Sequence, residues 1–321
     1  MNATGYFTHK DCWKHEMGPG HPECPERLDA IEDRLLITGV GDALERREAP
    51  LAPLGDLELA HDRMLVSAIR GLSDGLAEDI LAGGPAHVQI DPDTSLNVHT
   101  WRAALRAAGA ALAATDAVLA GEMGNAFCAV RPPGHHAQRN KAMGFCFFNN
   151  IAIAAKYALE RHGLKRVAIA DFDVHHGNGT EDIIRGDNRI LMVSFFQHPF
   201  YPFSGADTSP DHRDGNMVNL PVPAYTKGME IRDLIEMMWI PRLEAFKPEM
   251  IFICAGFDGH REDDMGQLGL VEQDYAWITQ RIKDVARRHA RGRIVSSLEG
   301  GYCLSALARS VEAHIRVLAD L

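Results

Sequence analysis

The chain has 321 residues, of which 46% are hydrophobic, and its formal net charge is −11 at pH 7. That length is ample for a large buried core, and the acidic balance argues against a broad nucleic-acid-binding surface. The sequence shows no signal-peptide pattern and no membrane-length apolar run, and its six cysteines form no Cys-x-x-Cys pair. We therefore expect free thiols, no membrane association and a reducing, cytoplasmic setting.

Helical patterns and short apolar runs alternate along the chain. The first helix opens at Pro25 and places Leu28, Ile31 and Leu35 on one face. Further helices are expected over residues 103–119, 150–159, 231–243, 274–288 and 306–318, the second of these capped by Asn149 or Asn150. Continuous apolar runs lie between the helices at residues 126–130, 167–170, 190–194, 250–254 and 294–296.

Continuous rather than alternating apolarity is typical of strands that are buried on both faces. It predicts an α/β fold with a parallel sheet, organised as one domain over residues 1–321. Unusual polar motifs follow four of the apolar runs, and in open α/β sheets the ligand lies outside the carboxyl ends of the strands. We therefore expect the four motifs to converge on one site at that edge of the sheet.

The motif after the second run is the richest in potential metal ligands. Asp171, Asp173 and His175 are spaced two apart, so an extended chain points them to the same side. Asp173 and His175, together with Asp258 from the loop after the run at 250–254, are the proposed metal ligands. Oxygen and nitrogen ligands without thiolate fit a catalytic zinc site, and three protein ligands leave positions open for water and a carbonyl.

Two further motifs supply the groups that hydrolysis of an amide needs. His135 and His136 follow a Pro-Pro-Gly turn and can serve as a general base and a general acid. Asp171 and Asn178 are candidate partners for their other ring nitrogens. Tyr302 follows two glycines, and its hydroxyl can stabilise a developing oxyanion.

Aromatic residues near these motifs are candidates for the wall of a narrow substrate channel. Gly144 and Phe145 belong to one loop and Tyr201 to another, whereas Phe147 and Phe148 are expected in the core. Other histidines lie close to the motifs but stay outside the catalytic set, either because they point the other way or because they occupy polar loops: His176, His198, His212 and His260.

Taken together, the motifs resemble those of the zinc-dependent histone deacetylase superfamily, which includes bacterial histone-deacetylase-like amidohydrolases and acetylpolyamine amidohydrolases. The matching segments cover nearly the whole chain in order: Gly-His-Pro-Glu-Cys-Pro-Glu-Arg-Leu (20–28), Arg-Pro-Pro-Gly-His-His (131–136), Gly-Phe-Cys-Phe-Phe-Asn (144–149), Asp-Phe-Asp-Val-His-His-Gly-Asn-Gly-Thr (171–180), Ala-Gly-Phe-Asp (255–258) and Glu-Gly-Gly-Tyr (299–302).

The resemblance implies the arginase/deacetylase fold, with a central parallel sheet of about eight strands, and one zinc ion on Asp173, His175 and Asp258. It implies that His136 is the main general base and acid. His135, paired with Asp171, would give electrostatic support, and Tyr302 would polarise the carbonyl. These roles together amount to hydrolysis of an N-acyl amide, most simply that of N6-acetyl-lysine.

The resemblance also extends to groups around the reaction centre. Phe145 and Tyr201 match the two aromatic residues of the tunnel wall, and Ser194 with the backbone of residues 171–175 matches a potassium site. Asn178 stands where class I enzymes usually carry Asp, so the chain looks class II-like.

The chain departs from the family pattern in two segments. Phe203 and Ser204 replace small residues at the rim of the pocket. Met265 stands, by spacing, where polyamine-selective relatives carry an acidic gatekeeper, which argues against a polyamine substrate, although acidic residues at 262–264 lie close.

Several alternatives stay open. The chain is expected to act on an acylated lysine, on an acetylated polyamine, or as a catalytically silent acyl-ligand binder. A binuclear ureohydrolase is disfavoured by the single Asp258 after its strand, whereas a homo-oligomer and occupancy by Fe²⁺ are compatible with the sequence.

Overall fold

A computed structural model describes residues 3–206 and 215–321 of the chain. Its centre is an eight-stranded sheet in the order β2-β1-β5-β10-β9-β6-β7-β8, in which neighbouring strands run parallel. The strands are β1 (Thr4–Thr8), β2 (Leu44–Glu48), β5 (Asn125–Cys128), β6 (Val167–Asp171), β7 (Ile190–Gln197), β8 (Met217–Val222), β9 (Met250–Ala255) and β10 (Ile294–Leu298). The predicted α/β class and the arginase/deacetylase sheet of about eight strands are confirmed.

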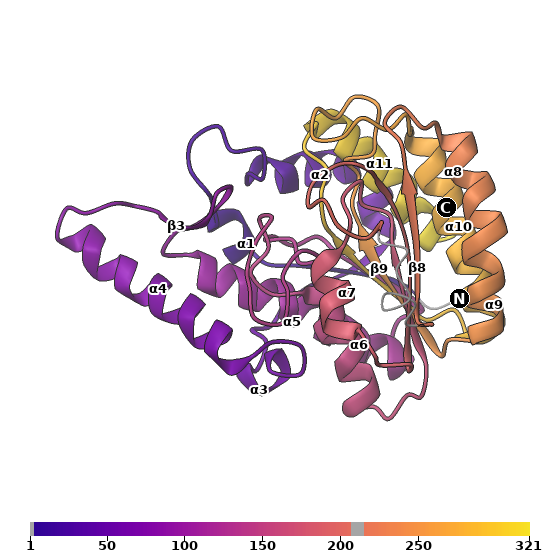
Figure 1. Cartoon of the computed structure of the whole chain (residues 1–321), viewed down its shortest axis with the longest axis horizontal. Coiled ribbons are helices and arrows are strands. Elements are labelled where there is room, and N and C mark those ends of the chain that lie inside the picture. Colours follow the sequence, from indigo (N-terminus) through magenta and orange to yellow (C-terminus); the bar gives the residue numbers. More distant parts are fainter. Residues whose placement is uncertain (1–2, 207–214) are drawn as a thin grey trace.

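Helices cover both faces of this sheet. Helices α8 to α11 lie on one side and α5 to α7 on the other, while α3, α4 and the hairpin β3-β4 extend away from the sheet (Figure 1). The helices are α1 (Asp11–Lys14), α2 (Glu26–Ile37), α3 (Leu54–Leu57), α4 (Arg63–Leu81), α5 (Thr100–Leu119), α6 (Asn150–Glu160), α7 (Asn178–Ile184), α8 (Gly228–Leu234), α9 (Ile240–Phe246), α10 (Glu272–His289) and α11 (Leu304–Leu318). The hairpin pairs Val88–Asp91 with Thr94–Leu96, a 3-10 turn covers Val40–Ala43, and one π-helical turn joins α8 to α9 at Ile235–Trp239.

The order of the strands matters most for the site. The four strands that precede the polar motifs, β5, β10, β9 and β6, are consecutive neighbours at the middle of the sheet. All are buried along their length, as their continuous apolar sequences predict. Because they are parallel, their carboxyl ends meet at one edge and bring the four motifs together.

Local capping fixes where the neighbouring helices begin. The Asn149 side-chain oxygen accepts a hydrogen bond from the backbone N–H of Ala152 at 3.0 Å, so Asn149 is the N-cap of α6. In the ranges that the structure describes, no helix is both long and apolar enough to cross a bilayer.

Two buried histidines are kept neutral by burial, and each makes hydrogen bonds through both ring nitrogens. His314 lies between the hydroxyls of Thr279 (2.6 Å) and Ser296 (2.9 Å), and burial lowers its pKa to about 3. His61 donates through Nδ1 to the carbonyl of Gln138 and accepts the N–H of Asn149 at Nε2, and burial lowers its pKa to about 4.

Acid should therefore destabilise the fold through these two side chains. An unfolded histidine binds a proton below about pH 6.5 while the folded one does not, so stability is full above that pH and falls as the pH drops toward 4. Each histidine contributes at most about 1.4 kcal/mol per pH unit. Urea unfolding of the wild type and of His314→Gln at pH 7 and pH 5 should give a smaller pH-dependent loss for the variant. An equal loss in both proteins would contradict the assignment.

Candidate active site

The carboxyl ends of the four central strands surround a cavity of about 230 Å³. Seven of the sequence-predicted site residues line it, and they come from loops far apart in the chain: His136, Gly144, Phe145, His175, Tyr201, Met265 and Tyr302. The structure adds three lining residues that the sequence did not single out as members of the site: Asp93, Phe200 and Asp264.

The proposed metal ligands form one compact cluster. The ligand atoms of Asp173, His175 and Asp258 lie within 4.8 Å of one another, and all three residues are buried. His175 Nδ1 is 3.0 Å from Asp173 Oδ1 and 3.2 Å from Asp258 Oδ2. These three residues are the only such cluster found among the described residues, so the second ligand set of a binuclear ureohydrolase is not seen there.

The charge of this cluster fits a divalent cation. Burial, together with the nearby charge of Asp173, raises the pKa of Asp258 to about 6. Within the described part of the chain, Asp258 Oδ2 accepts no hydrogen bond although it is fully buried. An orphaned carboxylate oxygen beside a second carboxylate and an imidazole is a set of donors that suits zinc or another divalent metal.

The glycine at position 300 makes the close approach of the two carboxylates sterically feasible. A Cβ atom at Gly300 would lie 2.0 Å from Asp258 Oδ2 and 2.7 Å from Asp173 Oδ2. Its backbone N–H instead donates to Asp173 Oδ2 at 2.9 Å. The Glu-Gly-Gly-Tyr motif therefore shapes the metal cluster as well as carrying the tyrosine.

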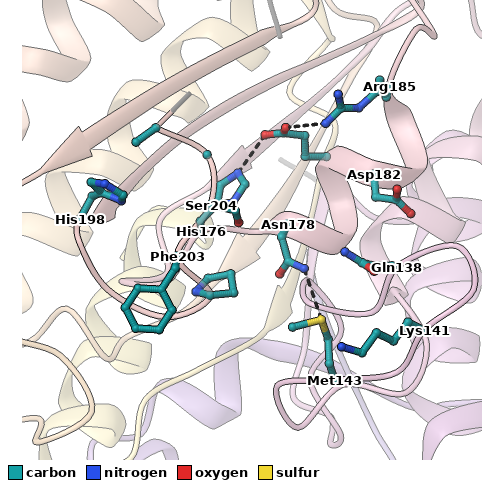
Figure 2. A pocket seen from close by; sticks show the side chains of 14 residues that line it. Gln138, Lys141, Met143, His176, Asn178, Asp182, Arg185, His198, Phe203 and Ser204 are labelled. Atoms are coloured by element: carbon teal, nitrogen blue, oxygen red, sulfur yellow. Dashed lines mark hydrogen bonds and ion pairs between the residues drawn. The ribbon is translucent and has the colours of Figure 1, made fainter. Parts of the chain in front are cut away.

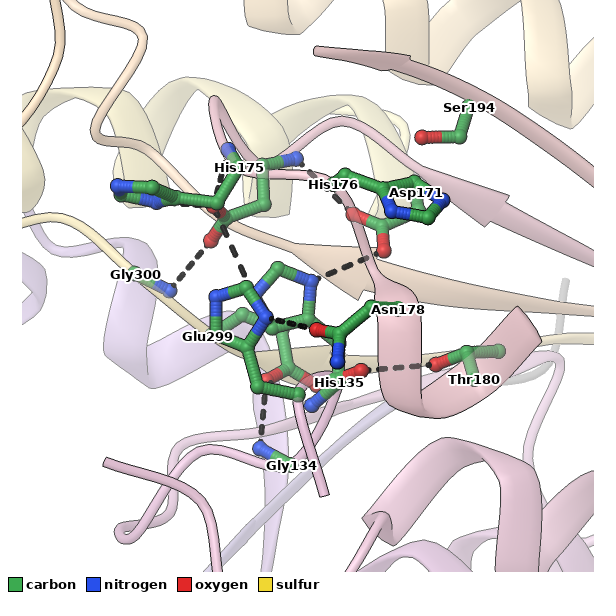
Figure 3. A network of polar contacts seen from close by, with 12 residues as sticks. Gly134, His135, Asp171, His175, His176, Asn178, Thr180, Ser194, Glu299 and Gly300 are labelled. Carbon is green, nitrogen blue, oxygen red and sulfur yellow. Dashed lines mark hydrogen bonds and ion pairs between the residues drawn. The ribbon is translucent and has the colours of Figure 1, made fainter. Parts of the chain in front are cut away.

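The two adjacent histidines have different partners. His135 Nδ1 lies 3.0 Å from Asp171 Oδ2 (Figure 3). His136 Nδ1 lies 2.7 Å from Asn178 Oδ1. Burial opposes protonation of His135, but the charges of Asp173 and Asp171 outweigh it and raise its pKa to about 10. Burial and the neighbouring positive charge of His135 hold the pKa of His136 well below its ordinary value.

A buried glutamate supports the backbone beneath this pair. Glu299 Oε2 accepts the backbone N–H groups of Gly134 at 2.6 Å and of His135 at 3.1 Å (Figure 3). Its side chain is fully buried, and burial raises its pKa to about 7. The sequence did not predict this role of Glu299, because its partners Gly134 and His135 lie 165 and 164 residues away along the chain.

Tyr302 approaches the cavity from the loop after β10. Burial raises the pKa of its phenol well above the ordinary value, so the hydroxyl stays protonated and able to donate. The guanidinium of Arg27 lies over its ring at 5.0 Å, and Phe145 meets it edge-on at 5.9 Å between centroids. These contacts fix the plane of the ring at the side of the cavity.

Aromatic rings form the remaining walls. Tyr201 meets the ring of His136 edge-on at 5.2 Å between centroids, and Phe200 stacks on His175 at 5.4 Å. Gly144 has a φ of +56°, and a Cβ atom there would lie 2.5 Å from the His136 ring, so glycine is required at this point of the wall. The expected core positions of Phe147 and Phe148 are confirmed by their burial.

Asn178 lines a second, larger cavity of about 660 Å³ (Figure 2). His176 faces this second cavity rather than the first, and its ring bonds Ser204 and Glu181. His198 also lines it. Phe203 also lines the second cavity, and its side chain is 75% exposed. This is the rim position that departs from the family pattern.

Three other sequence interpretations have different outcomes. Ser194 is buried on β7 directly opposite Asp171 of β6, with its hydroxyl 3.5 Å from the Phe195 carbonyl, outside the first cavity. His260, which the sequence places in a polar loop, is buried: its side chain is 1% exposed and its Nε2 lies 3.6 Å from Glu272 Oε1. His212 lies outside the described residues.

Comparison with known proteins identifies the family to which this geometry belongs. A family model described as the histone deacetylase domain matches residues 21–318. The chain is 36% identical over 320 residues to a histone deacetylase-like amidohydrolase of Pseudomonas aeruginosa, covering 93% of this chain and 81% of that protein. It is 37% identical over 308 residues to the polyamine deacetylase HDAC10 of Mus musculus, covering 92% of this chain but 44% of that protein. The crystal structure of the HDA15 HD domain superposes with a TM-score of 0.91 at 32% identity, covering 99% of this chain and 88% of that one.

Loss of one ligand should remove the metal. Asp258→Asn deletes an anionic donor from a three-ligand set, so we expect its zinc affinity to fall by about 10²-fold or more. Zinc content after dialysis and direct titration would measure this, with about one zinc ion per chain in the wild type and in the control Asp182→Asn, an exposed carboxylate of α7 outside the cluster. Stoichiometric zinc in Asp258→Asn would exclude it as a ligand.

Proposed function

The chain belongs to the histone deacetylase domain family, and from this premise we propose that it is a zinc-dependent deacylase that hydrolyses the amide of an N6-acyl-lysine side chain. Acetyl is the simplest acyl group for a cavity of about 230 Å³ with aromatic walls. The single observation that supports the proposal best is the convergence of the Asp-His-Asp cluster, the histidine pair and the tyrosine on this cavity. An acyl-ligand binder without catalysis has no need for all three.

Zinc held by Asp173, His175 and Asp258 would supply a Lewis acid that lowers the pKa of water to about 7 and polarises a carbonyl. The neutral ring of His136 donates through Nδ1 to Asn178, which leaves the Nε2 lone pair free to accept a proton from the attacking water. The same nitrogen then returns the proton to the leaving amine as the carbon–nitrogen bond breaks.

Two other groups stabilise the charge that develops on the carbonyl oxygen. His135, kept positive by Asp171 and Asp173, places a cation beside the reaction centre. The protonated phenol of Tyr302 donates its O–H to the oxyanion. Phe145 and Tyr201, with Gly144 and Met265, enclose the aliphatic part of the substrate and exclude water.

The proposal extends to the domain organisation, a second cation site and the cellular setting. We infer one catalytic domain over residues 1–321 and a potassium site at Ser194 with the backbone of residues 171–175. The six cysteines, all free, favour a reducing, cytoplasmic setting.

A test of the proposal combines substrate and variant. The wild type should deacetylate an acetyl-lysine peptide, lose that activity with a chelator and regain it with zinc. Tyr302→Phe should lower kcat by about 10²–10³-fold, because one oxyanion donor is lost, while a hydroxamate still binds. Tyr225→Phe, an exposed phenol outside the cavity, serves as the control. Full turnover by Tyr302→Phe would overturn the oxyanion role, and zinc-loaded, folded wild type without any turnover would favour the silent binder.

Deacetylation of an acetylated polyamine is a second candidate, supported by two carboxylates in the cavity wall. Asp264 and Asp93 line the cavity together with Met265, so an acidic group is present beside the predicted gatekeeper position. Burial and a hydrogen bond with Asp91 raise the pKa of Asp93, which indicates crowded negative charge that a substrate cation would relieve. Among the relatives, the mouse protein is named a polyamine deacetylase.

Neutralising these acids separates the two substrate classes. Asp264→Asn and Asp93→Asn should each lower kcat/KM for N-acetylspermidine by about 10-fold, the order of one lost charge pairing, and change that for an acetyl-lysine peptide little. Steady-state kinetics with both substrates would show the difference, with Glu262→Gln as a control because that side chain instead pairs with Arg309. Equal losses of kcat/KM for both substrates would contradict a role of these acids in selecting a cationic substrate.

A further inference from the structure

One buried carboxylate links two walls of the cavity through their backbones. Asp263 is 4% exposed, and its Oδ2 accepts the N–H groups of Tyr302 at 2.6 Å and Cys303 at 2.9 Å. Its Oδ1 accepts the N–H of Met265 at 3.0 Å. Asp263 therefore joins the loop after β9 to the loop after β10 at the residue that carries the phenol.

The Tyr302 loop is held at two points. Gly301, with a φ of +121° that other residues rarely adopt, has its carbonyl bonded by the buried Arg27 guanidinium at 2.7 Å, and the N–H groups that follow are bonded by Asp263. Helix α11 begins directly after this loop, and its N-cap residue Cys303 makes no side-chain capping bond. Asp263, from a different loop, accepts the N–H of Cys303 at the N-cap position, where negative charge is favoured by the helix N-terminus.

The other end of the link is in the substrate channel. Met265 lines the same cavity as Tyr302, and its backbone N–H donates to the second oxygen of the same carboxylate. Among the described residues, Asp263 forms no ion pair. Its carboxylate oxygens instead accept hydrogen bonds from three backbone N–H groups.

We propose that Asp263 is a positioning residue. By bonding the backbone of Met265 and of Tyr302 at once, its carboxylate fixes the Tyr302 hydroxyl relative to the tunnel wall. The inference rests on the proposed deacylase function and deepens it by assigning a residue that acts through Tyr302. A substrate that packs against Met265 then has its carbonyl oxygen at hydrogen-bonding distance from the Tyr302 hydroxyl. A misplacement of about 1 Å at such a donor costs about 10²-fold in rate.

The decisive variant is Asp263→Asn. An amide offers one acceptor oxygen, and its NH₂ group faces the remaining backbone N–H groups donor to donor, so either Tyr302 or Met265 is released. We expect kcat for an acetyl-lysine peptide to fall by about 10–10²-fold, with KM and hydroxamate affinity changed by less than about 3-fold. Glu262→Gln, the same chemical change one residue earlier on an exposed side chain paired with Arg309, should behave as the wild type.

A double-mutant cycle separates positioning from general destabilisation. If Asp263 acts through Tyr302, Asp263→Asn should cost less than about 3-fold when it is added to Tyr302→Phe, since the donor it positions is already absent. Equal losses in both backgrounds, or unchanged kcat in Asp263→Asn, would overturn the inference. If Asp263→Asn does not fold, Asp263→Glu takes its place in the cycle, because it keeps both acceptor oxygens and displaces them by one methylene. Zinc-loaded wild type and Glu262→Gln without turnover would overturn the proposed function itself, whereas active controls beside an unaffected Asp263→Asn would overturn only this inference.

Discussion

The burial of several carboxylates at one edge of the sheet is the constraint on which the rest of the structure depends. Asp171, Asp173, Asp258 and Glu299 are all 0% exposed, and an isolated buried carboxylate is strongly unfavourable. Each accepts a hydrogen bond on at least one oxygen. The donors are backbone N–H groups for Glu299, Asp173 and Asp258, and the His135 imidazole for Asp171. The positions of the histidines and of the surrounding loops follow from that requirement.

This constraint explains the division of labour between the two histidines. His135 shares its surroundings with two anions and is held positive, whereas His136 pairs with the neutral amide of Asn178 and is kept neutral. Two imidazoles adjacent in sequence thus have opposite charge states because their partners differ. Environments that push apart the pKa values of two neighbouring groups are the physical basis of acid–base assignment in enzymes.

The central strands and the motifs after them could be predicted from the sequence, because buried parallel strands give continuous apolar runs and each motif is local. The edge strand β2 (Leu-Glu-Arg-Arg-Glu) was not predicted, since it is half exposed and carries no apolar run. The roles of Asp263 and Glu299 were also missed, because their partners lie 39 and 165 residues away and no local pattern marks such a pair. The burial of His260 was not predicted either, because the polar composition of its loop gives no sign that the loop folds inward.

The central location of the four site-bearing strands has a consequence for how the protein opens. Strands β5, β10, β9 and β6 have a neighbour on both sides, whereas β2 and β8 form the outer edges. Local unfolding proceeds from elements with few buried contacts, so the edges exchange their amide hydrogens in small openings while the central strands exchange only when the whole sheet opens. We therefore expect the ends of these four strands to belong to the most slowly exchanging unit of the molecule, so that the base of the site outlasts the outer strands as the protein opens.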